Sequence, residues 1–119
     1  MKPLRWPYVK ALTGAWPVQF GPRDEFTIIP TRFDALKTWR VFWEDMPEAW
    51  MALRRIERED WLGKRHQVRS IARAGAFGSF VVAHRLKNGR NRFVDGNHRV
   101  LAAILAKWRG PVLVLMAKP

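Results

Sequence analysis

The sequence contains no cysteine, and this absence excludes a disulfide framework, a thiolate nucleophile and a cysteine-ligated zinc site. Its three histidines have no metal-ligand spacing, so we expect no zinc site, and we expect no haem. The longest uncharged apolar run, Val100 to Ala106, is far shorter than the roughly 20 residues that span a bilayer. Pro7, Lys10 and Pro17 interrupt the N-terminal segment, which therefore lacks a signal-peptide core. These absences predict a soluble cytoplasmic protein without membrane contact.

Acidic residues are scarce in the second half of the chain, where the charge becomes strongly positive. Residues 1–60 carry ten Lys or Arg against nine Asp or Glu, whereas residues 61–119 carry twelve against one, Asp95. Fifteen of the 22 basic residues are arginine, which suits planar contacts with phosphate. The pattern predicts a nucleic-acid or polyphosphate partner. The alternative is a solvated face that only keeps the protein soluble.

Length and composition predict one domain. With 119 residues, of which 48% are hydrophobic, the chain can form a single ordinary core. Residues 1–25 are rich in proline, glycine and aromatics without a clean period, so we predict an N-terminal arm that lies on the domain. The domain itself is expected over residues 26–119, with a tryptophan-rich helical elaboration at about 39–61.

Hydrophobic patterning predicts four strands in this domain. They are expected at Phe26–Pro30, Ser79–Leu86, Arg92–Asp95 and Val112–Met116. The middle two form a hairpin across Lys87-Asn88-Gly89-Arg90, because Asn-Gly between β-rich runs is a strong hairpin signal. With the helices between them, these strands predict the α+β (α/β) class, a small mixed sheet of about four strands with helices packed on it.

Two helices are expected before the basic half. A short one falls within Phe33–Trp43. The second begins at Asp45 as N-cap, with Glu48 completing a capping box and Pro47 in the first turn. Its expected apolar face consists of Trp50, Leu53 and Ile56.

Two further helices are expected in the basic half. Lys64–Ala74 has an apolar stripe and a natural stop at Gly75. After Gly96 the apolar period changes to about 3.6 residues. The stripe of this last helix consists of Leu101, Ile104, Leu105 and Trp108, and Gly110-Pro111 is expected to end it.

The junction Asp95-Gly96-Asn97-His98-Arg99, between the last hairpin strand and the last helix, is the predicted site. The first N–H groups of a helix have no partner within it and carry partial positive charge, so they bind phosphate. Gly96 has no Cβ to block the approach of a ligand, and His98 and Arg99 can donate to the same phosphate. Asp95 can hold Arg99, cap the helix or share a magnesium ion with the phosphates. The alternative is a capped helix with solvated basic residues beside it.

DGNHR, followed by the amphipathic stretch VLAAILAKW, Gly-Pro and an apolar strand, resembles the ParB/sulfiredoxin-like fold. Members of that fold carry a Gly-x-His-Arg or Gly-Glu-Arg-Arg box at this junction. Upstream, HQVRSIARAG fits the preceding helix and FVVAHRL the preceding strand. The resemblance covers Phe26 to Ala117, with Trp39–Trp61 as an elaboration.

The resemblance implies a phosphate site made of Gly96, Asn97, His98 and Arg99, with Asp95 before them. The phosphates belong to CTP in ParB-like proteins and to ATP or ADP in sulfiredoxins and free-serine kinases, and some plasmid-borne relatives are nucleases. The resemblance therefore implies a nucleoside triphosphate, CTP or ATP, with magnesium. In our own interpretation Asp95 either holds the magnesium ion or orients Arg99, and Asp95 and His98 are the expected catalytic residues.

The sequence departs from the family in two ways. Sulfiredoxins have their catalytic cysteine where this chain has Asn97, so reductase chemistry is excluded. ParB proteins continue into a helix-turn-helix domain, whereas this sequence stops at Pro119, so we expect a stand-alone core.

A kinase would also need a carboxylate to activate the substrate hydroxyl. Glu57, Glu59 and Asp60 are candidates that cannot be aligned to that role.

Eight basic residues are expected to contact a nucleic-acid backbone with little sequence preference, since no recognition helix is apparent. They are Lys64, Arg65, Arg69, Arg73, Arg85, Lys87, Arg90 and Arg92. Four tryptophans can either fill the core or stack on bases, and we expect most in the core with one or two exposed. These are Trp39, Trp43, Trp50 and Trp61. His66 and His84 are expected to be surface or strand residues.

Three functions are consistent with these features. The first is a phosphate-binding domain acting on or at DNA, as a nucleotide-dependent DNA-binding factor or a nuclease of a plasmid or phage. The second is a small-molecule phosphotransferase that uses ATP or ADP. The third is an interaction protein with an acidic partner, in which the junction is only structural. Homodimerisation stays open in all three.

Overall fold

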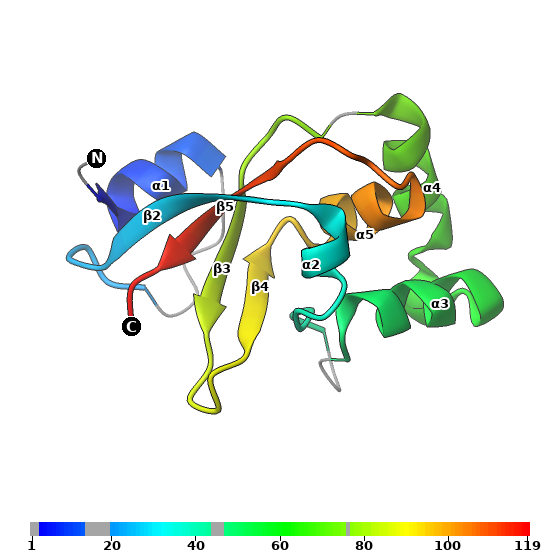
Figure 1. Ribbon diagram of the computed structural model, residues 1–119, viewed down its shortest axis with the longest axis horizontal. Helices are drawn as coiled ribbons and strands as arrows, with labels where there is room; N and C mark the ends of the chain where they lie inside the picture. Colours follow the sequence, from blue (N-terminus) through cyan, green and yellow to red (C-terminus); the bar gives the residue numbers. More distant parts are fainter. Residues whose placement is uncertain (1–2, 14–19, 44–46, 76) are drawn as a thin grey trace.

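Five strands form one mixed sheet in the computed structural model, which describes residues 3–13, 20–43, 47–75 and 77–119 (Figure 1). They are β1 (Leu4–Arg5), β2 (Glu25–Thr31), β3 (Val81–Arg85), β4 (Asn91–Asp95) and β5 (Val112–Ala117). Their order in space is β1-β2-β5-β3-β4, and all neighbours are antiparallel except β3 and β5. The predicted α+β class is confirmed, with one strand more than expected.

Helices cover both faces of the sheet. On one face lies α1 (Trp6–Thr13), and at the other side are α2 (Phe33–Leu36), α3 (Ala49–Glu59), α4 (Arg65–Ala74) and α5 (Asn97–Leu105), with a single 3-10 turn, η1 (Trp61–Gly63), between α3 and α4 (Figure 1). Within the described ranges, none of these helices is long and apolar enough to cross a bilayer.

Side chains along the central strands alternate between two core clusters, one on each face of the sheet. In β3, Val81 and Ala83 belong to the larger core cluster beneath α3, α4 and α5, whereas Val82 between them faces the smaller cluster. In β5, Val114 and Leu115 divide in the same way. Side chains of a strand point alternately to opposite faces, so both faces of this sheet are buried.

The N-terminal segment provides the second layer. Leu4 and Arg5 pair with β2 as an edge strand, and the α1 residues Trp6 and Val9 are buried in the smaller cluster. The Trp6 ring lies 5.0 Å from the ring of Phe20. The irregular composition of residues 1–25 hid this strand and helix from the sequence pattern.

The helix predicted within Phe33–Trp43 is shorter than expected. It ends at Leu36, because the chain then becomes extended and pairs with the free side of β4. The N–H of Arg40 donates to Asn91 O at 2.8 Å, and the N–H of Phe93 donates to Arg40 O at 2.9 Å. This pairing, between residues 51 and 53 apart in sequence, has no local signal.

The predicted capping box at the start of α3 is wrong. The helix begins at Ala49, and Pro47 lies before it, because residues 47–49 pair with residues 39–41 instead. Glu48 occupies the N-cap position without a side-chain cap, and Asp45 lies outside the described residues. The expected apolar face is also only partly correct, since Leu53 and Ile56 are buried but Trp50 is exposed.

The last helix ends before Gly110-Pro111. It stops at Leu105, and Lys107 adopts a left-handed conformation at φ 53°. The N–H groups of Lys107 and Trp108 then donate back to Ile104 O and Ala103 O, which is a Schellman C-cap. Trp108 is therefore not part of the helical stripe, and its ring packs against Phe77 at 5.2 Å.

Candidate functional site

Gly96 shapes the junction between β4 and α5. It is the N-cap residue of α5 at φ 85°, a conformation that favours glycine. A Cβ added there would lie 2.5 Å from Val81 Cγ1. The sequence suggested that Gly96 clears space for a ligand, whereas the structure places the side chain of Val81 in that space. The glycine therefore lets the start of α5 pack closely on β3.

Asn97 is a structural residue of the junction. Only 7% of its surface is exposed, and its Oδ1 accepts a hydrogen bond from the N–H of Phe42 at 3.0 Å. This bond holds the chain after Arg40 against the first turn of α5. Of the predicted phosphate ligands, Asn97 thus has its side-chain oxygen directed into the protein.

His98 lies at the start of α5 in a partly aromatic environment. Its ring is 5.1 Å from the ring of Trp43, and Lys64 Nζ lies 5.9 Å from the centroid of that same Trp43 ring. His98 Nε2 is buried and has no hydrogen-bond partner among the described residues. Burial lowers the pKa of His98, and the charge of Lys64 lowers this pKa further. His98 is therefore neutral near pH 7, with Nε2 as a polar atom that a ligand can satisfy.

This pKa predicts how stability depends on pH. The folded state favours neutral His98, whereas the unfolded chain takes up the proton near pH 6.5, so stability is full above that value and falls as the pH decreases. We expect the free energy of unfolding to fall between about pH 7.5 and about pH 5.5, and His98→Gln to reduce this fall. Urea unfolding across the pH range measures it.

His84 must be separated from His98 in that experiment. Burial lowers the pKa of His84 as well, and the charge of Arg92 acts in the same direction, so His84→Gln is expected to remove a second part of the fall. Exposed His66 provides the control, and His66→Gln should retain the wild-type dependence. An unchanged fall in His98→Gln would contradict the environment described for His98.

Arg99 and Asp95 complete the junction. Arg99 Nη1 donates to Phe80 O at 2.9 Å, so the side chain links α5 to the segment before β3. Burial raises the pKa of Asp95, while the charge of Arg99 and a hydrogen bond from the Gly96 N–H act against this rise. The charge of Arg99 thus reaches Asp95, while the hydrogen bond of the Arg99 side chain goes to Phe80 O. The described residues contain no group of three His, Asp or Glu arranged to hold a metal ion.

The predicted basic residues of α4 are not all equivalent. Lys64, which precedes the helix, lies beside His98 and Trp43. Arg69 Nε donates to both carboxylate oxygens of Glu57 of α3, each at 3.0 Å. The Arg65 backbone N–H donates to Asp60 Oδ1 at 2.9 Å, and Arg73 is exposed. The structure thus brings Lys64 to the junction and uses Arg69 to join two helices.

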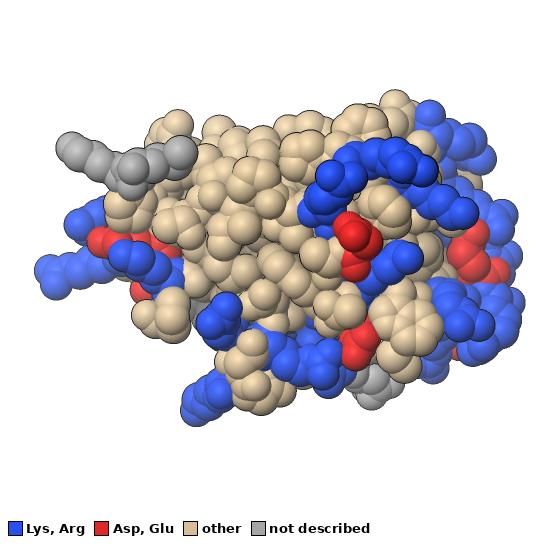
Figure 2. All heavy atoms as spheres, viewed as in Figure 1, with Lys and Arg blue, Asp and Glu red and all other residues tan. Residues whose placement is uncertain are grey.

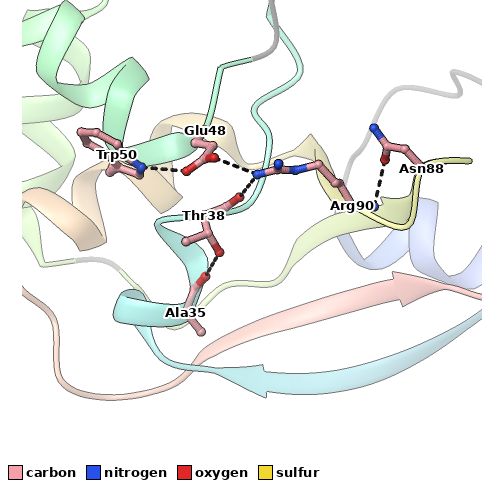
Figure 3. Close-up of polar contacts among 6 residues, drawn as sticks. All are labelled: Ala35, Thr38, Glu48, Trp50, Asn88 and Arg90. Carbon is pink, nitrogen blue, oxygen red and sulfur yellow. Dashed lines mark hydrogen bonds and ion pairs between the residues drawn. The ribbon is translucent and has the colours of Figure 1, made fainter.

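The basic residues of the hairpin also differ in their surroundings. Arg90 Nη2 donates to Glu48 Oε1 at 2.8 Å, and the other carboxylate oxygen of Glu48 accepts from Trp50 Nε1 at 2.8 Å (Figure 3). These hydrogen bonds, from Trp50 and from Arg90, lower the pKa of Glu48. Arg92 Nε donates to His84 Nε2 at 2.9 Å. The other two predicted basic residues of the hairpin, Arg85 and Lys87, are exposed.

Positive charge is unevenly distributed over the surface. Figure 2 shows lysine and arginine gathered at the end of the molecule formed by the helices and along the β3–β4 hairpin, while the area over β2 and β5 is mostly uncharged. Acidic side chains at the helical end are paired, as in Arg55–Glu59 at 2.7 Å and Arg69–Glu57 at 3.0 Å. Glu57, Glu59 and Asp60, the carboxylates considered for a kinase, therefore all make contacts within the protein.

Tryptophans connect the junction to α3. The rings of Trp43 and Trp61 are 6.1 Å apart, and the Arg55 guanidinium lies 4.6 Å from the Trp61 centroid. A continuous series of contacts thus runs from His98 through Trp43 and Trp61 to Arg55. The expectation that most tryptophans lie in the core is met in part: Trp39, Trp43 and Trp61 are half-buried against the larger cluster, and Trp50 is exposed.

Known proteins provide no further identification. Comparisons of the chain with protein-family models, with curated proteins and with solved structures found no significant match. The ParB/sulfiredoxin-like resemblance therefore stays a prediction that depends on the residues of the junction and their order along the chain.

Proposed function

We propose that this protein is a ParB/sulfiredoxin-like domain that acts in the cytoplasm by binding the phosphate backbone of DNA at the start of α5. The observation that carries the proposal is the meeting of Lys64, the buried unpartnered Nε2 of His98 and the first turn of α5 at one place. Lys64 and the helix end attract an anion, and neutral His98 can donate a hydrogen bond in the tautomer that carries the proton on Nε2.

The first turn of α5 provides backbone donors. The first hydrogen bond of the helix runs from Val100 N–H to Gly96 O at 3.0 Å. The N–H groups of Asn97, His98 and Arg99 precede it, so they have no acceptor within the helix, and the helix dipole adds positive charge there. A phosphate is the ligand that such a helix end binds best.

The surrounding charge supports a polymer with many phosphates. Arg73 of α4 and Arg85 and Lys87 of the hairpin are exposed basic residues, and Asp95 is the sole acid of residues 61–119. Contacts of this kind follow the phosphate backbone and carry no base specificity. We therefore expect binding with little preference for sequence.

The family resemblance adds two hypotheses to this binding activity. One is that CTP or ATP with magnesium occupies the same phosphate site, and the other is that Asp95 and His98 cleave DNA. Addition of each nucleotide with magnesium to a DNA titration tests the first, since the two ligands would compete. Incubation of a labelled duplex with magnesium tests the second.

Lys64→Ala is expected to weaken DNA binding and to reduce its salt dependence. Each phosphate contact contributes a slope of about 0.9 when the logarithm of affinity is plotted against that of salt concentration. Loss of one contact should lower the slope by about this amount for every duplex sequence. Fluorescence anisotropy of a labelled 20-base-pair duplex, titrated over a series of salt concentrations, measures the slope.

Lys10→Ala is the matched control. Lys10 is an exposed lysine on α1, at the opposite end of the molecule from α4 (Figure 1). Lys10→Ala removes the same charge as Lys64→Ala. Because Lys10 is far from the proposed site, its substitution should leave the salt slope of DNA binding unchanged. Equal slopes for the two variants would exclude the site at α5, and a wild-type affinity that does not change with salt would exclude DNA as the partner.

A further inference from the structure

The outer side of α3 carries two rows of side chains that border a groove. Trp50, Arg54 and Arg58 form one row at four-residue spacing, and Met51 and Arg55 form the row beside it. With Pro47 these residues line a hollow of about 340 Å³. A second hollow of about 350 Å³ lies on the other side of Trp50 and Arg54, bordered by Phe33 and Lys37.

Apolar surface is exposed in this groove. Trp50 is 36% exposed and Met51 46% exposed, although both belong to a helix whose opposite face is fully buried. The Arg54 guanidinium lies 5.8 Å from the Trp50 centroid, and the indole N–H is fixed by Glu48. The hydrogen bond to Glu48 holds the indole in one orientation, and both hollows border the indole.

The charge of the groove determines which ligand fits it. Three arginines line the first hollow, and Lys37 and Lys107 add positive charge to the second. Of the nearby acids, Glu48 accepts hydrogen bonds from the Trp50 indole and from Arg90. Glu57 is directed to Arg69 of α4, and Glu59 forms an exposed pair with Arg55 that a phosphate can replace. The ligand must therefore be anionic and must also present flat apolar surface.

We propose that the α3 groove binds a single strand of nucleic acid, with an unpaired base on Trp50 and the adjoining phosphates on Arg54 and Arg58. Base stacking on an aromatic side chain beside arginines is how proteins hold unpaired strands. In a duplex the base faces are covered by their neighbours, so this groove favours a single strand. The inference rests on the proposed function, because it specifies the form of nucleic acid that the same protein binds.

A series of side-chain contacts links the groove to the start of α5. Arg55 lines the groove and stacks on Trp61, which contacts Trp43, which in turn contacts His98. A strand whose phosphate lies at the start of α5 can therefore continue along aromatic and basic side chains to Trp50.

Anisotropy titrations of a labelled 20-nucleotide oligo(dT) and of a 20-base-pair duplex test the inference. We expect wild type to bind the strand more tightly than the duplex. Trp50→Ala should weaken strand binding about 5-fold to about 100-fold, the range for loss of one base–aromatic stack, and leave duplex binding within about twofold. Trp50→Phe retains a ring but loses the hydrogen bond to Glu48, so it should keep most of the strand affinity.

Tyr8→Ala is the matched control, since Tyr8 is an exposed aromatic residue of α1. Equal weakening of strand and duplex in Trp50→Ala, or equal effects of Trp50→Ala and Tyr8→Ala, would overturn the inference while the proposed function stands. Absence of binding to both nucleic acids would overturn both. A labelled acidic peptide that binds more tightly than the strand, and loses affinity in Trp50→Ala, would assign the groove to a protein partner and also overturn it.

Discussion

Gly96→Ala is expected to lower the free energy of unfolding by about 2–4 kcal/mol. Two costs combine at this position. A Cβ at φ 85° is strained in the left-handed region, and the new methyl would lie 2.5 Å from Val81 Cγ1 and 2.9 Å from Val81 Cβ. Because β3 and α5 are both packed in the core, neither can move without loss of other contacts. Urea unfolding measures the change.

Gly89→Ala separates these two costs. Gly89 has a similar φ of 84° in the hairpin turn, but an added Cβ there would meet nothing within 4 Å. We expect it to lose only about 1 kcal/mol, the conformational part. The double variant Gly96→Ala with Val81→Ala should be less destabilised than the sum of its parts, because truncation of Val81 removes the closest atom. Equal losses for Gly89→Ala and Gly96→Ala would contradict the steric explanation.

Phe93→Ala is expected to cost about 3–5 kcal/mol. The side chain is fully buried in the larger cluster, and the Trp39 ring stacks on it at 5.3 Å with an angle of 28°. Truncation would leave a cavity between β4 and the extended segment that carries Trp39 and Trp43. Urea unfolding again gives the loss, and DNA titration should show weaker binding because Trp43 contacts His98.

Phe42→Ala is the control for Phe93→Ala. Phe42 belongs to the same region, but it is 39% exposed and its ring mainly faces the Arg92 guanidinium at 5.2 Å. Loss of an exposed ring should cost about 1 kcal/mol or less. A similar loss in both variants would show that the Trp39–Phe93 stack does not hold the segment on the sheet.

Sequence periodicity predicted the elements whose signals are local. The hairpin across Asn88-Gly89, the helix that ends at Gly75 and the apolar strand after Pro111 all lie where the pattern placed them. Each is determined by turn residues or by a run of neighbouring apolar side chains. The structure differs from the prediction where contacts join distant parts of the chain. For example, Arg40 was expected within a helix but pairs with Arg92 of β4.

The strand-to-helix junction of the candidate site was predicted in position, but its packing was not. Its place at the start of α5 follows from the strand-to-helix change around Gly96. The packing of Gly96 on Val81, and the bond from the Phe42 N–H to Asn97, involve partners 15 and 55 residues away, which no motif indicates. Trp50 was expected in the core because its spacing fits the apolar stripe, yet the buried face of α3 consists of Ala49, Ala52, Leu53 and Ile56, and Trp50 is exposed.

The central position of β5 determines how the protein can fold. This strand follows the other described strands in sequence, yet it lies between β2 and β3 and pairs with both. Without residues 112–117, β1–β2 and β3–β4 would be two separate antiparallel pairs, and β2 and β3 would each have an unpaired edge. Pairings across such sequence distances form slowly. Both core clusters therefore depend on β5, which contributes Val114 to the larger one and Leu115 to the smaller one.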